Sequence, residues 1–415
     1  MAKKQKVIFV LPHTFEPFFK KIKEDIMNVK DLDHFSTRYL SFMVKSTNKY
    51  DFEFFIISSK VKKPLRVKHK NGFYIHVFPR DFPSILPLET STSMLKEIKR
   101  RCHTKENIIW HVNSYYMIMS DPISFLLKKE KQSFALHHRG AGFSVRTLPY
   151  SIYKYWIMNP MIFKAADIVV AENRDEERKL LKNYKLDRNK VMYAPNPVEI
   201  VEVKKDKRTL RKELGLPQDK TVIVYAGRIM KGKGVTFLFN SLKPFLKKEK
   251  GIFFLMIGDG PQRPEIETAL KQEGIANAKM VLWVTREVLF RYLKACDLFV
   301  HPNRNEKFEG TPNALVEAQG AGLPVVGFDI GGVRDIVKEG MTGGLEKTKD
   351  MDAFARKIVS IAKDKKKLLE MSRNSRKNYD DNYDSSKILK SYERLYGTLI
   401  ERMKQKKRQS AEKKR

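Results

Sequence analysis

Short apolar runs alternate along this chain with segments of helical periodicity, and this alternation limits the folds that the chain can adopt. The first apolar run spans residues 6–11, and a helical pattern that mixes aromatic residues with lysines follows over 18–29. Strands that alternate with helices of this length favour βαβ units and a parallel sheet. Further strands are expected at 51–57, 108–112, 133–136, 168–171 and 191–194, helices at 93–101 and 122–129, and a strongly basic loop at 60–70.

The pattern restarts after the Pro-Asn-Pro sequence at 195–197, which is typical of a domain boundary. A chain of 415 residues is long enough to bury two cores. The sequence therefore predicts an α/β protein with two doubly wound parallel-sheet domains, and such sheets bind ligands beyond the carboxyl ends of their strands. In the second domain, strands are expected at 221–226, 252–257, 280–284, 298–301 and 323–328, and a helix at 234–248.

A helix start suited to an anion is predicted at the segment Glu309-Gly310-Thr311-Pro312. Thr311 suits the N-cap of this helix, and Pro312 suits its first turn, where the missing proline N–H costs nothing. The free backbone N–H groups and the helix dipole at such a start both attract anions.

Two carboxylates flank this helix start. Glu309 lies on the loop, and Glu317 follows eight residues later on the helix face of Asn313. A carboxylate has two acceptor oxygens and can hold both hydroxyls of a ribose, which is the role that suits Glu317. Gly331-Gly332 permits close approach of the backbone to a ligand. Taken singly, each of these residues is as readily an exposed glutamate or an ordinary turn glycine.

Two basic side chains follow the first strand of the second domain, in the sequence AGRIMKGKG. Gly227 turns the chain there, Arg228 comes directly after it, and Lys233 follows later in the same loop. Above the carboxyl edge of the sheet, a guanidinium and an ammonium can bind a diphosphate. The alternative for so lysine-rich a chain is a solvated basic loop. The sequence has no glycine-rich Walker loop, which argues against a nucleoside triphosphatase.

A histidine pair, His137-His138, follows the strand expected at 133–136. A histidine at the carboxyl end of a strand in an α/β sheet is placed at the ligand edge. His137 is the first after the strand and is the preferred candidate, with His138 as the alternative. A surface histidine pair beside a turn glycine is the competing interpretation.

The order of these parts resembles the donor site of retaining glycosyltransferases of family 4, within glycosyl transferases group 1. The family has the GT-B fold and a Glu-x7-Glu signature. The resemblance covers residues 190–346 well and the N-terminal domain in outline. The quoted segments are Glu309-Gly310-Thr311-Pro312, Glu317-Ala318, Gly322-Leu323-Pro324-Val325-Val326 and Gly331-Gly332.

The resemblance implies two Rossmann-like domains that face a central cleft. Residues 1–197 would form the acceptor side, 198–385 would bind the nucleotide-sugar, and 386–415 would form a helix crossing back to the N-terminal domain plus a basic tail. One departure is the segment at 12–17 after the first strand, which has no glycine where many family members have several.

The resemblance also implies roles for single residues. Arg228 and Lys233, with Gly227, would contact the donor pyrophosphate and neutralise the leaving nucleoside diphosphate, and Glu317 would bind the ribose. Glu309 and His137 would contact the transferred sugar, so both are the catalytic candidates. The donor-binding candidates are Gly227, Arg228, Lys233, Gly310, Thr311, Pro312, Asn313 and Glu317.

The expected function is transfer of a hexosyl group, with retention, from a UDP- or GDP-sugar to a lipid-linked or glycan acceptor in polysaccharide or glycoconjugate synthesis. A nucleotide-sugar epimerase or a phosphorylase on the same fold is an alternative. A non-catalytic basic protein that binds nucleic acid or membrane is an alternative of another class, and the two glutamates argue against it. No metal and no other cofactor is expected, because Asp31-Leu32-Asp33 lies at a helix end and no histidine or cysteine cluster has metal spacing.

The chain carries 82 Lys and Arg against 48 Asp and Glu. This balance favours anionic partners such as nucleotides or phospholipid headgroups, unless it reflects a basic proteome. Two cysteines give no disulfide framework, so the cytoplasm is the expected compartment. Basic residues at 15–30, at 60–70 and in the C-terminal helices suggest peripheral attachment to an anionic membrane surface, on its cytoplasmic face.

Overall fold

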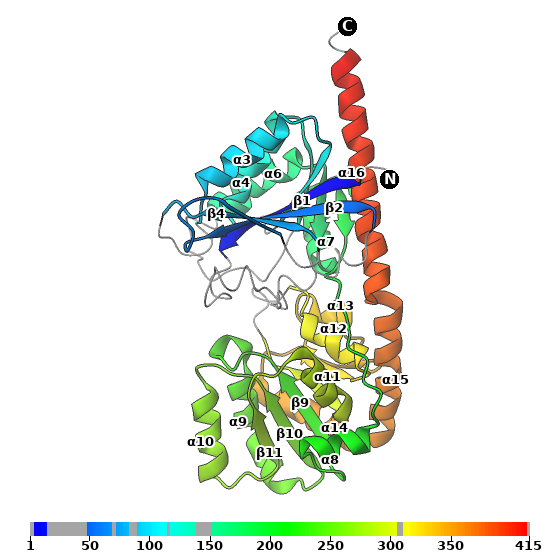
Figure 1. Cartoon of the computed structure of the whole chain (residues 1–415). Coiled ribbons are helices and arrows are strands. Elements are labelled where there is room, and N and C mark those ends of the chain that lie inside the picture. Colours follow the sequence, from blue (N-terminus) through cyan, green and yellow to red (C-terminus); the bar gives the residue numbers. More distant parts are fainter. Residues whose placement is uncertain are drawn as a thin grey trace. The chain divides into compact units, whose positions relative to one another are not determined.

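The computed structural model describes residues 4–14, 48–68, 72–82, 89–113, 117–137, 149, 152–304 and 310–412. The chain divides into two compact units, Met1–Pro197 with Ser386–Arg415, and Val198–Ser385 (Figure 1). The helix expected at 18–29 and the acidic triplet at 31–33 lie outside the described residues, as do Glu309 and His138.

The first unit contains an eight-stranded sheet with the order β3-β4-β2-β1-β5-β6-β7-β8. All neighbouring strands are parallel except β3 and β4, which are antiparallel. The strands are β1 (Gln5–Thr14), β2 (Tyr50–Ser58), β3 (Leu65–Lys68), β4 (Tyr74–Pro79), β5 (Ile108–Asn113), β6 (Ser133–His137), β7 (Ile168–Ala171) and β8 (Val191–Tyr193).

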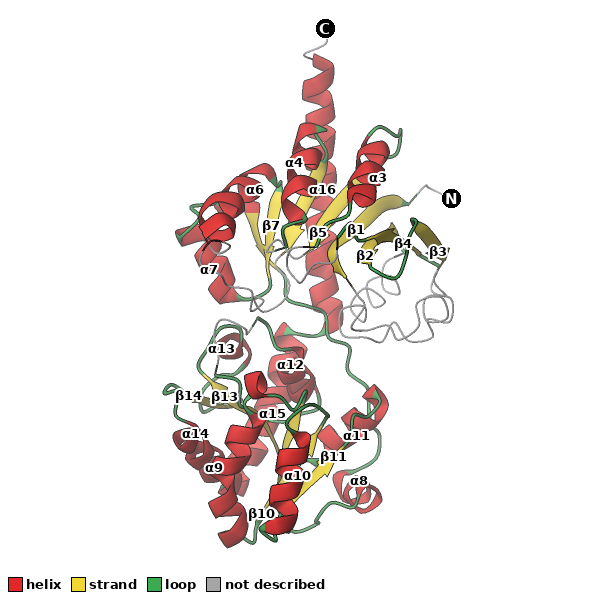
Figure 2. Cartoon of the chain, turned by 90° about the vertical axis from the view of Figure 1, so that its left-hand side faces the viewer, coloured by secondary structure: helices red, strands yellow, loops and turns green. Residues whose placement is uncertain are grey.

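Helices cover both faces of this sheet (Figure 2). Alternation along β1 sends Val7 and Phe9 to one face and Ile8 to the other, so each face has its own core. α3, α4 and α6 pack on the face of Ile8, whereas the long α16 packs on the face of Phe9. The helices are α3 (Thr92–Cys102), α4 (Ser120–Lys129), η2 (a π-helix, Ile152–Met158), α6 (Asn159–Ala165), α7 (Arg174–Lys182), η3 (Arg188–Lys190) and α16 (Ser385–Glu412).

The sequence predicted a loop over the basic stretch at 60–70. The structure differs from this prediction, because the short strand β3 lies within the stretch. Val67 is buried there between the exposed Arg66 and Lys68. One buried apolar side chain is enough for a short edge strand, and the surrounding charges hide it in the sequence.

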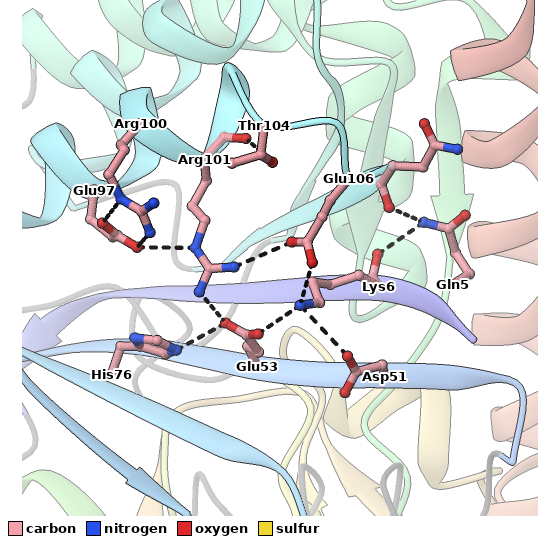
Figure 3. Close-up of polar contacts among 11 residues, drawn as sticks. Gln5, Lys6, Asp51, Glu53, His76, Glu97, Arg100, Arg101, Thr104 and Glu106 are labelled. Atoms are coloured by element: carbon pink, nitrogen blue, oxygen red, sulfur yellow. Dashed lines mark hydrogen bonds and ion pairs between the residues drawn. The ribbon is translucent and has the colours of Figure 1, made fainter. Parts of the chain in front are cut away.

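A buried carboxylate braces the first sheet near the amino ends of its strands. Glu53 on β2 lies 2.9 Å from Lys6 on β1, from His76 on β4 and from Arg101 on α3 (Figure 3). Burial alone would raise the pKa of Glu53, but the hydrogen bonds from His76 and Lys6 and the charge of Arg101 outweigh it and lower this pKa to about 2. Glu53 therefore stays ionised throughout the physiological pH range.

The second unit has six parallel strands in the order β11-β10-β9-β12-β13-β14, with the direction of winding reversed between β9 and β12. The strands are β9 (Thr221–Ala226), β10 (Ile252–Ile257), β11 (Ala278–Val281), β12 (Leu298–His301), β13 (Val325–Phe328) and β14 (Gly343–Glu346). The helices are α8 (Lys207–Leu214), η4 (a 3-10 turn, Lys231–Lys233), α9 (Val235–Lys248), α10 (Arg263–Gln272), α11 (Arg286–Ala295), α12 (Asn313–Gly320), α13 (Val333–Ile336), α14 (Met351–Lys363) and α15 (Lys365–Asn382).

The predicted strand at 280–284 is displaced, because β11 runs over Ala278–Val281. Its register with β10 pairs Ile257 with Val281, so the pairing ends where β10 ends. The apolar Leu282 and Trp283, which drew the prediction onward, are exposed. Across the described part of the chain, no helix is both long and apolar enough to cross a bilayer.

Candidate functional site

The carboxyl ends of β9 and β12 form the point in the second sheet where the strand order reverses. Ligands of open α/β sheets bind at such a point. Gly234, which precedes α9, has φ +77°, and a Cβ there would lie 2.3 Å from the carbonyl oxygen of Pro302 after β12. Only glycine therefore lets the segment after β9 approach the segment after β12 so closely.

Two helices begin at this edge without a side-chain cap. Gly234 is the N-cap of α9, Pro312 is the N-cap of α12, and within the described structure neither helix has a side-chain capping bond. Their first backbone N–H groups are therefore available to an anion. The expected start of α12 was wrong by one residue: Pro312, with ψ 106°, lies outside the helix, and Thr311 is not the N-cap.

The two basic candidates lie on the segment between β9 and α9. Arg228 is exposed, and the Tyr225 hydroxyl donates a 2.8 Å hydrogen bond to the Arg228 carbonyl oxygen, which fixes the turn. Lys233 is half-buried and ends η4, immediately before Gly234. Among the residues that the structure describes, neither cation is ion-paired with a carboxylate, so both charges are available to a ligand.

Glu317 is buried on α12 and is held by an arginine. The Arg286 Nη1 atom lies 2.5 Å from Glu317 Oε1, and both side chains are largely buried. Arg286 is the first residue of α11, directly beyond the carboxyl end of β11. The pair neutralises a buried carboxylate on the helix that starts, uncapped, at this edge.

One helical turn before Glu317, the Asn313 Oδ1 atom is buried and has no hydrogen-bond partner among the described residues. Buried polar atoms are normally satisfied, so this oxygen is a candidate acceptor for a hydrogen bond from a ligand. Beside it, a Cβ on Gly332 would lie 2.3 Å from the Gly310 carbonyl oxygen. The diglycine turn thus packs against the start of the α12 segment.

His137 ends β6 in the first unit, and its side chain is completely buried. Its Nδ1 atom lies 3.1 Å from Nε2 of His111, and Nδ1 of His111 lies 3.1 Å from the hydroxyl of Tyr396 on α16. On the other side, His137 Nε2 lies 4.0 Å from Glu172, which follows β7. Strand alternation explains this placement, because His137 shares the sheet face of Ala135, which α16 covers.

The predicted donor residues thus lie at one edge of the second unit, in the segments Gly227 to Lys233 and Gly310 to Glu317. His137 belongs to the first unit. Arg286, His111 and Tyr396 were missed. Among 82 basic residues, Arg286 has no distinguishing local pattern, and only its position after a strand could have indicated its role. Tyr396 lies 285 residues from His111, and no local pattern links them.

Comparison with known proteins agrees with this geometry. Residues 206–378 match the family described as "Glycosyl transferases group 1". The chain is similar to the capsular polysaccharide biosynthesis glycosyltransferase CapM of Staphylococcus aureus, at 22% identity over 353 residues, covering 82% of this chain and 91% of that protein. It is also similar to the D-inositol 3-phosphate glycosyltransferase of Nocardia farcinica, at 28% identity over 219 residues, but this match covers 51% of the chain and only 48% of the relative.

Solved structures are similar over nearly the whole chain. Anabaena Alr3699/HepE in complex with UDP has a TM-score of 0.69 at 14% identity, with 95% of this chain and all of that chain covered. Sucrose-phosphate synthase from Thermosynechococcus elongatus has a TM-score of 0.71 at 18% identity, with 96% and 99% covered.

The fold is therefore GT-B, as predicted, with two Rossmann-like parallel-sheet units. Residues 206–378 are similar to the glycosyl transferases group 1, and the chain is a glycosyltransferase. The alternative of a non-catalytic basic protein loses its support.

Proposed function

We propose that this enzyme transfers a hexosyl group from a UDP- or GDP-sugar to a lipid-linked or glycan acceptor, with retention at the anomeric carbon, as a member of family 4. The observation that carries the proposal is the buried Arg286–Glu317 pair on the helix that starts, uncapped, at the strand-order reversal. The names of similar proteins support the substrate class, since HepE is described in complex with UDP and with UDP-glucose, and CapM belongs to capsular polysaccharide biosynthesis.

In this proposal the diphosphate binds between the two uncapped helix starts. Arg228 binds it as a planar fork and Lys233 as a point charge, and the first N–H groups of α12 complete the site. Gly227 and Gly310 leave room for the phosphates to approach the backbone. As the glycosidic bond breaks, negative charge grows on the leaving diphosphate, and these groups stabilise it.

Glu317 binds the ribose hydroxyls with its carboxylate, whose orientation is fixed by Arg286 at Oε1. A held carboxylate loses less conformational entropy when the nucleoside binds, which favours affinity. Asn313, one turn earlier, offers its buried Oδ1 atom to the same ligand.

Glu309 and the histidine pair act on the transferred sugar in this proposal. Glu309 supports the positive charge that develops at the anomeric carbon. The ring of His137 is buried between His111 and Glu172. Its burial favours His138 for direct contact with the sugar and gives His137 the task of holding the end of β6.

A panel of UDP-, GDP- and ADP-sugars tests the donor class by thermal unfolding. A ligand that binds only the folded state at about 100 times its Kd stabilises it by about 2.7 kcal/mol. One nucleotide class should therefore raise the Tm, and a Glu317→Gln variant should lose most of that shift. If no nucleotide-sugar and no nucleoside diphosphate raises the Tm, the donor site is wrongly placed.

The stereochemical part is tested separately, with the donor found by the panel. The anomeric configuration of the first-formed product, read by NMR before it mutarotates, should match that of the donor. A product of opposite configuration would overturn retention and the family 4 assignment, while leaving the donor site intact.

A further inference from the structure

An exposed apolar stripe runs along η2 and α6 in the first unit. Ile152 is 46% exposed, Trp156 81%, Ile157 51% and Met161 49%. Four large apolar side chains within ten consecutive residues leave a continuous apolar surface, whereas single exposed residues are normal on a soluble protein.

The spacing places the stripe on one side of the helix. Ile152 is followed by Trp156 and Ile157 after one turn of π-helix, and Met161 follows after one turn of α-helix. The opposite side is buried, with Ile162 and Phe163 in the core of the first unit. The stripe is therefore the outer face of a firmly packed element.

A buried ion pair anchors this element. Lys154 on η2 is completely buried and is paired with Asp121 on α4, and the Tyr153 hydroxyl donates a 3.2 Å hydrogen bond to Asp121 Oδ2. Breaking such a pair leaves an uncompensated charge in the interior, which is strongly unfavourable. The pair thus holds the wide π-turn, and with it Trp156, at the surface.

The exposed charged side chains on α4, η2 and α6 have one sign. Across α4, η2 and α6 the only acidic residue is Asp121, and it is buried. Lys128, Lys129 and Lys164 are exposed on the same elements. Lys190 lies at the same end of α6, where its Nζ atom donates a hydrogen bond to the Lys164 carbonyl oxygen.

We propose that this stripe docks the enzyme on an anionic lipid bilayer, with Trp156, Ile157 and Met161 inserted among the headgroups. Helices that lie in a bilayer interface combine an apolar face containing tryptophan with flanking lysines, as here. A protein partner would have to match an apolar stripe whose own helices expose lysines and no carboxylate. This inference refines the membrane-borne acceptor of the proposed function, but its test requires no catalysis, so either can fail alone.

Sedimentation with vesicles tests the docking surface in the full-length chain. The wild-type protein should sediment with vesicles made of an equal mixture of phosphatidylglycerol and phosphatidylcholine. It should bind vesicles of pure phosphatidylcholine much more weakly. A Trp156→Ser/Ile157→Ser variant should lose about tenfold or more in partitioning, because it removes much of the inserted apolar area. Replacing Lys128 and Lys164 with glutamine should cost about fivefold for each lysine at low salt.

The chain offers a matched control. Trp283 in the second unit is 60% exposed beside the exposed Leu282, so Trp283→Ser removes a comparable surface tryptophan from another place. This variant should bind vesicles like the wild type. An equal loss in the Trp283 variant, or full binding by the Trp156 variant, would overturn the proposal.

Fluorescence gives a second readout. Trp110 is completely buried, so in a Trp283→Phe variant the exposed tryptophan is Trp156. Lipids with a quencher near the headgroup should quench its emission upon binding to anionic vesicles. If the wild type stays in the supernatant with both vesicle types, or if Trp156→Ser instead dissolves a dimer seen by light scattering, the stripe is not a membrane surface.

Discussion

The carboxyl edges of the two sheets are built in different ways. In the second unit, three turns that follow β9, β11 and β12 provide cations, uncapped helix starts and one paired carboxylate. In the first unit, the end of β6 is held by a chain of buried rings that reaches α16. Charge and backbone groups recognise a nucleotide in the one, whereas buried contacts fix a side chain in the other. Variants in the two regions should therefore fail in different ways.

The largest expected effect is on turnover. Glu309→Gln should lower kcat by about 100-fold or more, because Glu309 is proposed to act on the transferred sugar. His137→Ala should also lower kcat, because it releases the end of β6 beside the histidine that is proposed to contact the sugar. Nucleoside diphosphate affinity, measured by calorimetry, should change little. His138→Ala is the partner experiment, and a larger loss there than in His137→Ala would assign the direct sugar contact to His138. A parallel loss of nucleotide affinity in Glu309→Gln would contradict this division of roles.

The second effect is on nucleotide binding. Arg286→Ala should weaken UDP or GDP binding because Glu317 is no longer oriented toward the ribose. The loss should not exceed the roughly 10- to 150-fold that losing the charged hydrogen bond of Glu317 itself would cost, at about 1.5–3 kcal/mol. It also removes the cation that faces the buried Glu317 carboxylate, which costs stability. Adding Glu317→Gln should restore the lost stability without restoring the affinity. If Arg286→Ala binds nucleotide as tightly as the wild type, the pair has no part in the site.

The third effect concerns the brace of the first unit and pH. The pKa of Glu53 falls from 4.5 to about 2 upon folding, so the unfolded chain takes up this proton first as the pH falls. The ionised Glu53 therefore contributes about 3 kcal/mol to the free energy of unfolding above about pH 5. This contribution is lost as the pH falls toward 2. Urea unfolding of the wild type and of Glu53→Gln, measured between these pH values, should show a shallower pH dependence in the variant. Equal slopes would mean that other carboxylates dominate acid unfolding.

The smallest effect should come from Tyr396→Phe. The variant removes one buried hydrogen bond to His111 and should lower the free energy of unfolding by about 1 kcal/mol. Nucleotide affinity should be unchanged, because the contact belongs to the first unit. NMR of labelled histidines should show a changed ring state at His111. Wild-type stability and an unchanged histidine spectrum in this variant would show that α16 does not help to hold His137.

The same contrast explains what could be predicted from the sequence. The fold class and the strands at 168–171, 221–226, 252–257 and 298–301 were predicted correctly, because fully buried strands are continuous apolar runs. β3 was missed and β11 was displaced, because pairing with a neighbour decided their limits. The donor-site candidates near Gly310 are local in sequence, but Arg286 lies 31 residues from Glu317 and could not be inferred.

The helix α16 also has a consequence for how the protein is made. Ile388, Leu395 and Leu399, with two tyrosines, complete the apolar face of a sheet whose strands are all encoded before residue 198. A ribosome delivers this helix only after the whole of Val198–Ser385, which contributes all of its own strands. The second unit can therefore finish folding while one apolar face of the sheet in the first unit is still uncovered. During that interval the nascent chain exposes an aggregation-prone apolar surface. Chaperones that bind such surfaces would act on the first half of the chain.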